Sequence, residues 1–164
     1  MNEYLRWGGG ALLMIGSLFA GREYRRYTDV RLGELCGFID FLNHAKREIS
    51  TYLTPTQKIL RGFKNESLEA LGFISGIERY GSLGKAFSEC ADRSSLGKES
   101  KKLLSECFSG FGQGYKDAEI SRSERYVASL NEILETEREE LVKNAKIVSA
   151  LLLSGAVGIF ILLL

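Results

Sequence analysis

The chain has 164 residues, of which 45% are hydrophobic and 26% charged, a length and composition typical of one folded domain. Its formal net charge of +1 gives no overall positive field, so we expect no nucleic-acid partner. The charges are unevenly distributed, because only Glu3 and Arg6 precede Arg22 and none follows Lys146. Both ends are therefore candidates for membrane segments.

Residues 1–21 are predicted to form an N-terminal membrane anchor. The uncharged part, Trp7 to Gly21, spans about 22 Å as a helix, which is short for a hydrocarbon core of about 30 Å. A cleaved signal peptide is the alternative, but Leu18 fits poorly at the −3 position of a cleavage site after Ala20. Most of the positive charge also follows the apolar run, which favours an uncleaved anchor.

Residues 22–146 are predicted to form a cytoplasmic helical bundle. They contain a single proline, Pro55, and their apolar residues recur at three- and four-residue steps. A first helix over 22–52 would place one apolar face inward, made of Val30, Leu35, Phe38, Leu42, Ala45 and Ile49. Gly33 and Gly37 either weaken this helix or mark the close approach of a neighbour.

Shorter helices are predicted to follow. One starts at Thr54 and Pro55, and a second covers NESLEALGFISGIERYG. A third covers GSLGKAFSECADRS, where helical spacing puts four residues on one inward face: Leu83, Ala86, Phe87 and Cys90. A fourth, in LGKESKKLLSECFSGFGQGY, has an apolar face that includes Leu104, Cys107 and Phe108 and ends in a glycine-rich loop. The last helix starts near Asp117 and continues without a break to Leu164, over about 48 residues. The predicted fold is all-α, a bundle of about six helices between two transmembrane helices.

Residues 147–164 are predicted to be a C-terminal transmembrane helix. These 18 uncharged residues span about 27 Å as a helix. Only Ser149 and Ser154 are polar, and each hydroxyl can bond to a carbonyl one turn back. A buried core helix is the alternative, but a core helix with a solvent side would carry a polar face, and this segment has none.

Basic residues next to both spans predict their orientation. Arg22, Arg25 and Arg26 follow the first span, and Lys143 and Lys146 precede the second. Because cytoplasmic flanks of membrane spans are enriched in Lys and Arg, both counts place residues 22–146 in the cytoplasm.

Small residues four apart indicate that the spans pack against other spans. The pairs are Gly16 with Ala20, and Ser154 with Gly158. Such pairs allow close helix approach in membranes and are consistent with a homo-oligomer.

No residues predict catalysis, a cofactor or a metal site. His44 is the single histidine and is expected to be exposed and to pair with Asp40 and Glu48 along one helix. The three cysteines show no C-x-x-C spacing and are interpreted as buried thiols in a reducing cytosol: Cys36, Cys90 and Cys107. Neither a phosphate-binding P-loop nor a G-x-S-x-G motif occurs, so we do not expect an enzyme.

Three stretches follow one another in a characteristic order after the first span. They are LGELCGFIDFLNHAKREISTYLTP, then GSLGKAF, then a closing segment from FSGFGQGY to ILLL. The most specific parts of the closing segment are Phe111-Gly112, the acidic helix after this pair, and a terminal span with Gly155 and Ile161 to Leu164. Over essentially its whole length the chain resembles the stage III sporulation protein AB family of endospore-forming bacteria.

This resemblance implies a fold and a function. The family is similar in fold to the cytoplasmic domain of the type II secretion inner-membrane platform protein, a six-helix bundle. It implies a non-enzymatic scaffold in the outer forespore membrane of the mother cell, within a channel complex joining mother cell and forespore. The partners it implies are a cytosolic secretion-type ATPase and other stage III sporulation membrane proteins. The alternative function is a membrane-anchored helical protein that transmits a conformational signal.

Overall fold

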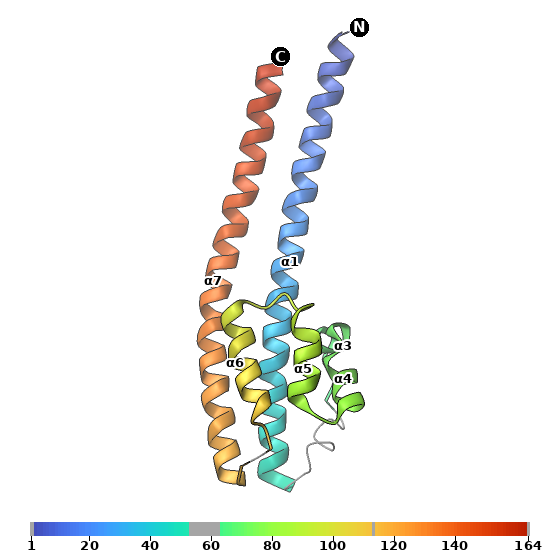
Figure 1. Cartoon of the computed structure of the whole chain (residues 1–164). Coiled ribbons are helices and arrows are strands. Elements are labelled where there is room, and N and C mark those ends of the chain that lie inside the picture. The colour runs from blue at the N-terminus through green and yellow to red at the C-terminus, as the bar shows by residue number, and fades with distance from the viewer. Residues whose placement is uncertain (1, 53–62, 113, 164) are drawn as a thin grey trace. The chain divides into compact units, whose positions relative to one another are not determined.

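The structure, a computed structural model, describes residues 2–52, 63–112 and 114–163. Within the helices it describes all side chains except those of 2–14, 17, 18, 51, 52, 156, 159, 160, 162 and 163. The described chain contains six helices and no strand, which confirms the predicted all-α fold. In order (Figure 1) they are α1 (Asn2–Tyr52), α3 (Glu66–Leu71), α4 (Phe73–Tyr80), α5 (Leu83–Ala91), α6 (Lys98–Ser109) and α7 (Lys116–Leu163).

The two long helices each belong to two compact units. The first unit, here called the paired-end unit, comprises Met1–Asp29 and Glu137–Leu164. The second, the bundle unit, comprises Val30–Thr136. Helix α7 is 48 residues long and continuous, as predicted. Helix α1 is continuous over 51 residues, whereas the sequence suggested an anchor followed by a separate bundle helix.

No helix in the part of the chain that the structure describes has a stretch both long enough and apolar enough to cross a membrane. Much of the two predicted spans lies outside the residues whose side chains are described: 1–14, 17 and 18 of the first, and 156, 159, 160 and 162–164 of the second. The helix predicted to start at Thr54 also lies outside the described residues.

A cluster of phenylalanines forms the centre of the bundle unit. The Phe38 ring of α1 lies with its centroid 5.0 Å from Phe73 of α4 and 5.4 Å from Phe87 of α5, both edge to face. Phe108 of α6 lies 5.9 Å from Phe38. Burying rings of this size in edge-to-face contact contributes more than their buried area alone. Four elements are thus joined through one aromatic core.

Most of the predicted apolar face of α1 is buried. Leu35, Phe38, Leu42 and Ala45 have no measurable exposure. Two residues of the predicted face are not buried: Val30 has 45% of its surface exposed, and Ile49 is only partly buried. The helical period therefore identified the centre of the inward face correctly and extended the face too far at both ends.

The predicted helix over NESLEALGFISGIERYG is two helices. Gly72 adopts a left-handed conformation (φ 83°), ends α3 and starts α4. Its N–H donates to the carbonyl of Glu69, which closes the last turn of α3. A left-handed residue is favourable for glycine, so the break occurs at this position.

Gly37 marks the close approach of a neighbouring helix. A Cβ atom there would lie 2.8 Å from Asn65 Oδ1 and 3.0 Å from Leu68 Cγ. Asn65 caps α3 by accepting the N–H of Leu68 at 3.1 Å. The glycine thus lets the capped start of α3 rest directly on α1.

Helices α5 and α6 agree with the sequence prediction. Leu83, Ala86, Phe87 and Cys90 are the buried residues of α5, and all four were predicted to point inward. In α6, Leu104, Cys107 and Phe108 are buried as expected.

Candidate functional site

The five basic residues predicted to flank the spans are all exposed. The structure brings two of them together: Arg25 of α1 and Lys146 of α7 line one cavity of about 310 Å³ in the paired-end unit. Arg22, Arg26 and Lys143 do not line it.

The predicted span-packing residues are exposed in the described part of the chain, and their packing against other spans stays a prediction. A Cβ atom at Gly16 or Gly158 would meet nothing within 4 Å, and Ala20 and Ser154 are exposed. Among the described residues of the paired-end unit, α1 and α7 approach each other at Gly21, whose Cβ position lies 3.8 Å from Ser149 Oγ. Ser154 Oγ donates to the Leu151 carbonyl at 3.2 Å, one turn back as expected.

Large apolar side chains are exposed along both helices of the paired-end unit. Leu151 is 65% and Leu153 57% exposed. These two residues project about 200° apart around a helix of 3.6 residues per turn, so two nearly opposite faces are apolar. The others with exposure above 40% are Ile15, Phe19, Tyr27, Val142, Ile147, Val157 and Ile161.

A glycine-rich loop joins α6 to α7 in the bundle unit. We call residues 110–114 the glycine loop; the structure describes it except for residue 113. Gly112 has φ 81°, and Tyr115, next to the loop, is 91% exposed. The loop includes the Phe111-Gly112 pair noted in the sequence.

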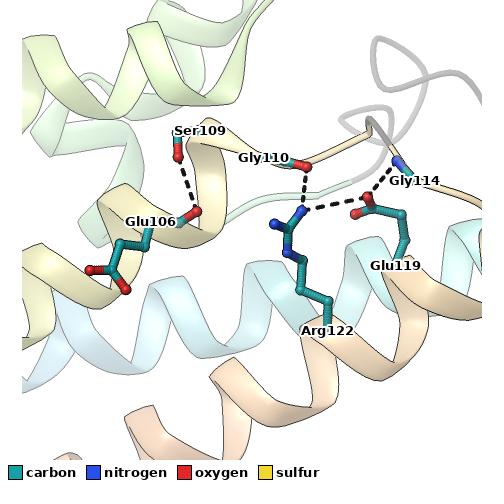
Figure 2. Close-up of polar contacts among 6 residues, drawn as sticks. All are labelled: Glu106, Ser109, Gly110, Gly114, Glu119 and Arg122. Carbon is teal, nitrogen blue, oxygen red and sulfur yellow. Dashed lines mark hydrogen bonds and ion pairs between the residues drawn. The ribbon is translucent and has the colours of Figure 1, made fainter.

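Two charged residues of α7 hold the glycine loop (Figure 2). Arg122 Nη1 donates to the Gly110 carbonyl at 2.5 Å, and Glu119 Oε1 accepts the N–H of Gly114 at 2.9 Å. Arg122 and Glu119 also form an ion pair at 3.8 Å, one turn apart. Hydrogen bonds to charged groups are stronger than neutral ones, so both ends of the loop are fixed to the start of α7.

These charges lie beside a buried thiol. Burial raises the pKa of Cys107 to about 12, Arg122 lowers it and Glu119 raises it. A thiol with such a pKa is almost entirely protonated at neutral pH and unreactive, so Cys107 is a structural residue here. Glu119 Oε2 is buried without a hydrogen-bond partner among the described residues. The pair of Glu119 and Arg122 was not predicted from the sequence, where it shows only as two opposite charges three residues apart, soon after a glycine-rich run.

A groove of about 470 Å³ lies elsewhere on the bundle unit. It is lined by Val30, Glu34, Glu66, Ser67, Ala70, Leu71, Arg93 and Ser95. Glu34 is 5% exposed and accepts the Ser95 N–H at 2.7 Å. Burial raises the pKa of this carboxyl, while the Ser95 hydrogen bond and Lys101 lower it. Glu34 was also missed, although its place beside Leu35 and one turn before Phe38 put it at the edge of the inward face.

Two predictions about single residues need correction. His44 is not an exposed residue: it is half-buried, with its ring 5.3 Å from Phe63. Cys90 and Cys107 are buried as predicted, but Cys36 is exposed, because it lies on the outer side of α1. The described residues contain no group of acidic, histidine or cysteine side chains that could hold a metal ion.

One comparison with known proteins identifies a family. The family model described as stage III sporulation protein AB matches residues 6–164. Neither the curated proteins nor the solved structures gave a match. Since the matched residues cover almost the whole chain, the protein belongs to the stage III sporulation protein AB family, and this membership implies a role in sporulation.

Proposed function

We propose that the protein is a non-enzymatic membrane platform subunit of a secretion-like channel complex between mother cell and forespore. The bundle unit lies at the cytoplasmic surface of the outer forespore membrane, where it docks a cytosolic secretion-type ATPase. Companion stage III sporulation membrane proteins bind beside it. Family membership supports the sporulation role. The exposed apolar side chains of α7 beyond Lys146 support the proposed membrane attachment.

The exposure pattern of α7 supports lipid as its environment. A helix on the surface of a water-soluble protein has one apolar stripe and an opposite polar face. Between Ile147 and Ile161, α7 has no charged residue, and Leu151 and Leu153 are exposed on nearly opposite faces. Hydrocarbon is the environment that accepts apolar side chains on all sides of a helix.

The surface beside the glycine loop is the proposed ATPase contact on the bundle. Tyr115 has almost all of its surface in solvent. Because tyrosine is among the residues that contribute most to protein interfaces, this exposed ring is a candidate contact for a partner. Glu119 and Arg122 hold the loop next to it, so little conformational entropy is lost when a partner binds there.

A pull-down from solubilised membranes of sporulating cells tests this function. The tagged wild-type chain should recover a secretion-type ATPase together with companion membrane proteins. Tyr115→Ala should reduce ATPase recovery about tenfold or more, as expected for a central aromatic contact. Tyr80→Ala, at another exposed tyrosine of the bundle unit, is the matched control and should leave recovery unchanged.

One outcome would contradict the platform function, and another would contradict the Tyr115 contact alone. Recovery of a sensor kinase or response regulator without any ATPase would favour the signalling alternative. Equal ATPase recovery with the wild type, Tyr115→Ala and Tyr80→Ala would be consistent with the platform function and would exclude the Tyr115 surface as the contact.

A further inference from the structure

We propose that Arg25 and Lys146 form a binding site for the phosphate of an anionic phospholipid headgroup. The site is the cavity of about 310 Å³ in the paired-end unit. Helix α1 and helix α7 each contribute three lining residues: Arg25, Thr28 and Asp29, and Val142, Ala145 and Lys146. This inference rests on the proposed membrane attachment and goes beyond it by identifying one lipid class and two ligating side chains.

The two cations are available for a ligand. Neither Arg25 nor Lys146 forms an ion pair with another residue that the structure describes, and both are exposed. Arg25 and Lys146 place two positive charges at one cavity and Asp29 offsets one of them, so the net positive lining attracts an anion. Arginine presents a planar set of N–H donors that matches phosphate oxygens, and lysine adds a compact positive charge.

The position along the helices fits a headgroup. Lys146 is the last charged residue before the uncharged end of α7, and Arg25 follows the uncharged segment of α1 by four residues. Phosphates of a bilayer lie just outside the hydrocarbon layer, where basic residues next to a span meet them.

The remaining lining residues indicate the kind of headgroup. Asp29 supplies a carboxylate, which reduces the net charge of the lining to +1 and can accept hydrogen bonds from hydroxyl groups. The Thr28 hydroxyl donates to the Tyr24 carbonyl at 3.0 Å and so has no proton left for phosphate. Val142 and Ala145 offer an apolar wall. A phosphodiester with one negative charge and a hydroxylated headgroup, as in phosphatidylglycerol, satisfies all of these groups.

The test measures lipid binding by the full chain in detergent micelles, with phosphatidylglycerol and phosphatidylcholine as probes. Native mass spectrometry counts the lipid molecules retained by each variant. The double variant R25Q/K146Q removes both proposed ligands. The double variant R26Q/K143Q removes the same charge from the same helices at exposed residues outside the cavity. Slow modification of Cys107 confirms that each variant keeps a folded bundle.

The wild type and R26Q/K143Q should retain phosphatidylglycerol over phosphatidylcholine, and R25Q/K146Q should lose this preference about tenfold. An equal loss in both double variants would overturn the site, because diffuse attraction would then explain binding. Equal retention of the two lipids by the wild type would overturn it as well. Displacement by glycerol phosphate at the same concentration as the lipid would assign the cavity to a free phosphate and exclude the lipid.

Membrane attachment is measured separately, by carbonate extraction of membranes containing the full chain. Release into the supernatant would contradict the proposed function. Retention in the membrane without a phosphatidylglycerol preference would contradict the lipid site alone.

Discussion

The same two helices carry apolar residues in two different ways. In the bundle unit, the apolar residues of α1 form one face, and Leu35, Phe38 and Leu42 are fully buried there. In the paired-end unit, Leu151 and Leu153 of α7 are exposed on nearly opposite faces. The placement of apolar residues around the helix thus differs between the two regions.

This difference separates the residues that stabilise the bundle unit from the residues that we propose attach the chain to a membrane. One-sided apolar residues bury against other helices and hold the bundle unit together. Leu151 and Leu153 stay exposed in the described chain, so under the proposed function they face lipid. Substitutions at the first kind of residue should change bundle stability, and substitutions at the second kind should not.

The largest effect is expected at Phe38. Phe38→Ala removes a ring that contacts Phe73, Phe87 and Phe108, and core substitutions of this kind cost about 3–5 kcal/mol. Site-resolved modification of the buried Cys107 in detergent-solubilised chain should become more than about a hundredfold faster, since each 1.4 kcal/mol is about tenfold in the opening equilibrium. Leu151→Ala is the control and should leave the rate unchanged; equal acceleration by both would remove the distinction between the regions.

A second effect compares two glycines of α1. Gly37→Ala places a methyl group 2.8 Å from the capping oxygen of Asn65 and 3.0 Å from the core residue Leu68, which should cost about 1–2 kcal/mol. Gly16→Ala meets nothing within 4 Å and should leave bundle stability unchanged. The rate of Cys107 modification measures both, and a Gly37→Ala chain as stable as the wild type would show that α3 does not rest on α1 in this way.

A smaller effect, confined to the opening of the glycine loop, is expected at Arg122. Arg122→Met keeps the aliphatic packing but loses the hydrogen bond to the Gly110 carbonyl, worth about 1 kcal/mol for a partly exposed group. Hydrogen exchange of peptides covering the loop should become about fivefold faster, while the core of α6 stays protected. Arg125→Met, at an exposed residue of the same helix, should have no such effect.

The smallest effect depends on pH. Burial raises the pKa of Glu34, so the folded state holds this proton more tightly than the unfolded state. The protonated Glu34 carboxyl therefore stabilises the folded state at pH values below the ordinary carboxyl pKa. This stabilisation is lost as the pH rises through the raised pKa. Glu34→Gln should raise the melting temperature by about 2–4 °C at pH 7 and leave it unchanged at pH 4.

Glu66→Gln is the control for that measurement. Glu66 lines the same groove but is exposed, so its replacement should leave the pH dependence of the wild type in place. A Glu34→Gln chain that melts like the wild type at every pH would show that the buried carboxylate carries no cost.

Helical period was sufficient to predict much of the bundle from the sequence. The buried residues of α5 were predicted one by one because Leu83, Ala86, Phe87 and Cys90 follow the three- and four-residue steps of a single face. The uninterrupted course of α7 was predicted because no glycine or proline occurs between Asp117 and Lys146.

Features that depend on backbone conformation or on distant partners were harder to predict. The break at Gly72 requires a left-handed residue inside a periodic segment, and the period continues across it. The contacts of Arg122 and Glu119 join α7 to a loop, so they depend on tertiary structure and leave only charge spacing in the sequence. The cavity shared by Arg25 and Lys146 joins residues more than a hundred positions apart.

The most direct test of the two-region account uses Cys36. This thiol is exposed on the bundle unit, whereas Cys90 and Cys107 are buried, so its labelling reports the compartment. A membrane-impermeant maleimide should label Cys36 in inside-out membrane vesicles and leave it unlabelled in right-side-out vesicles. Labelling in right-side-out vesicles, with Cys107 still protected, would contradict a cytoplasmic bundle held between two membrane-attached helix ends.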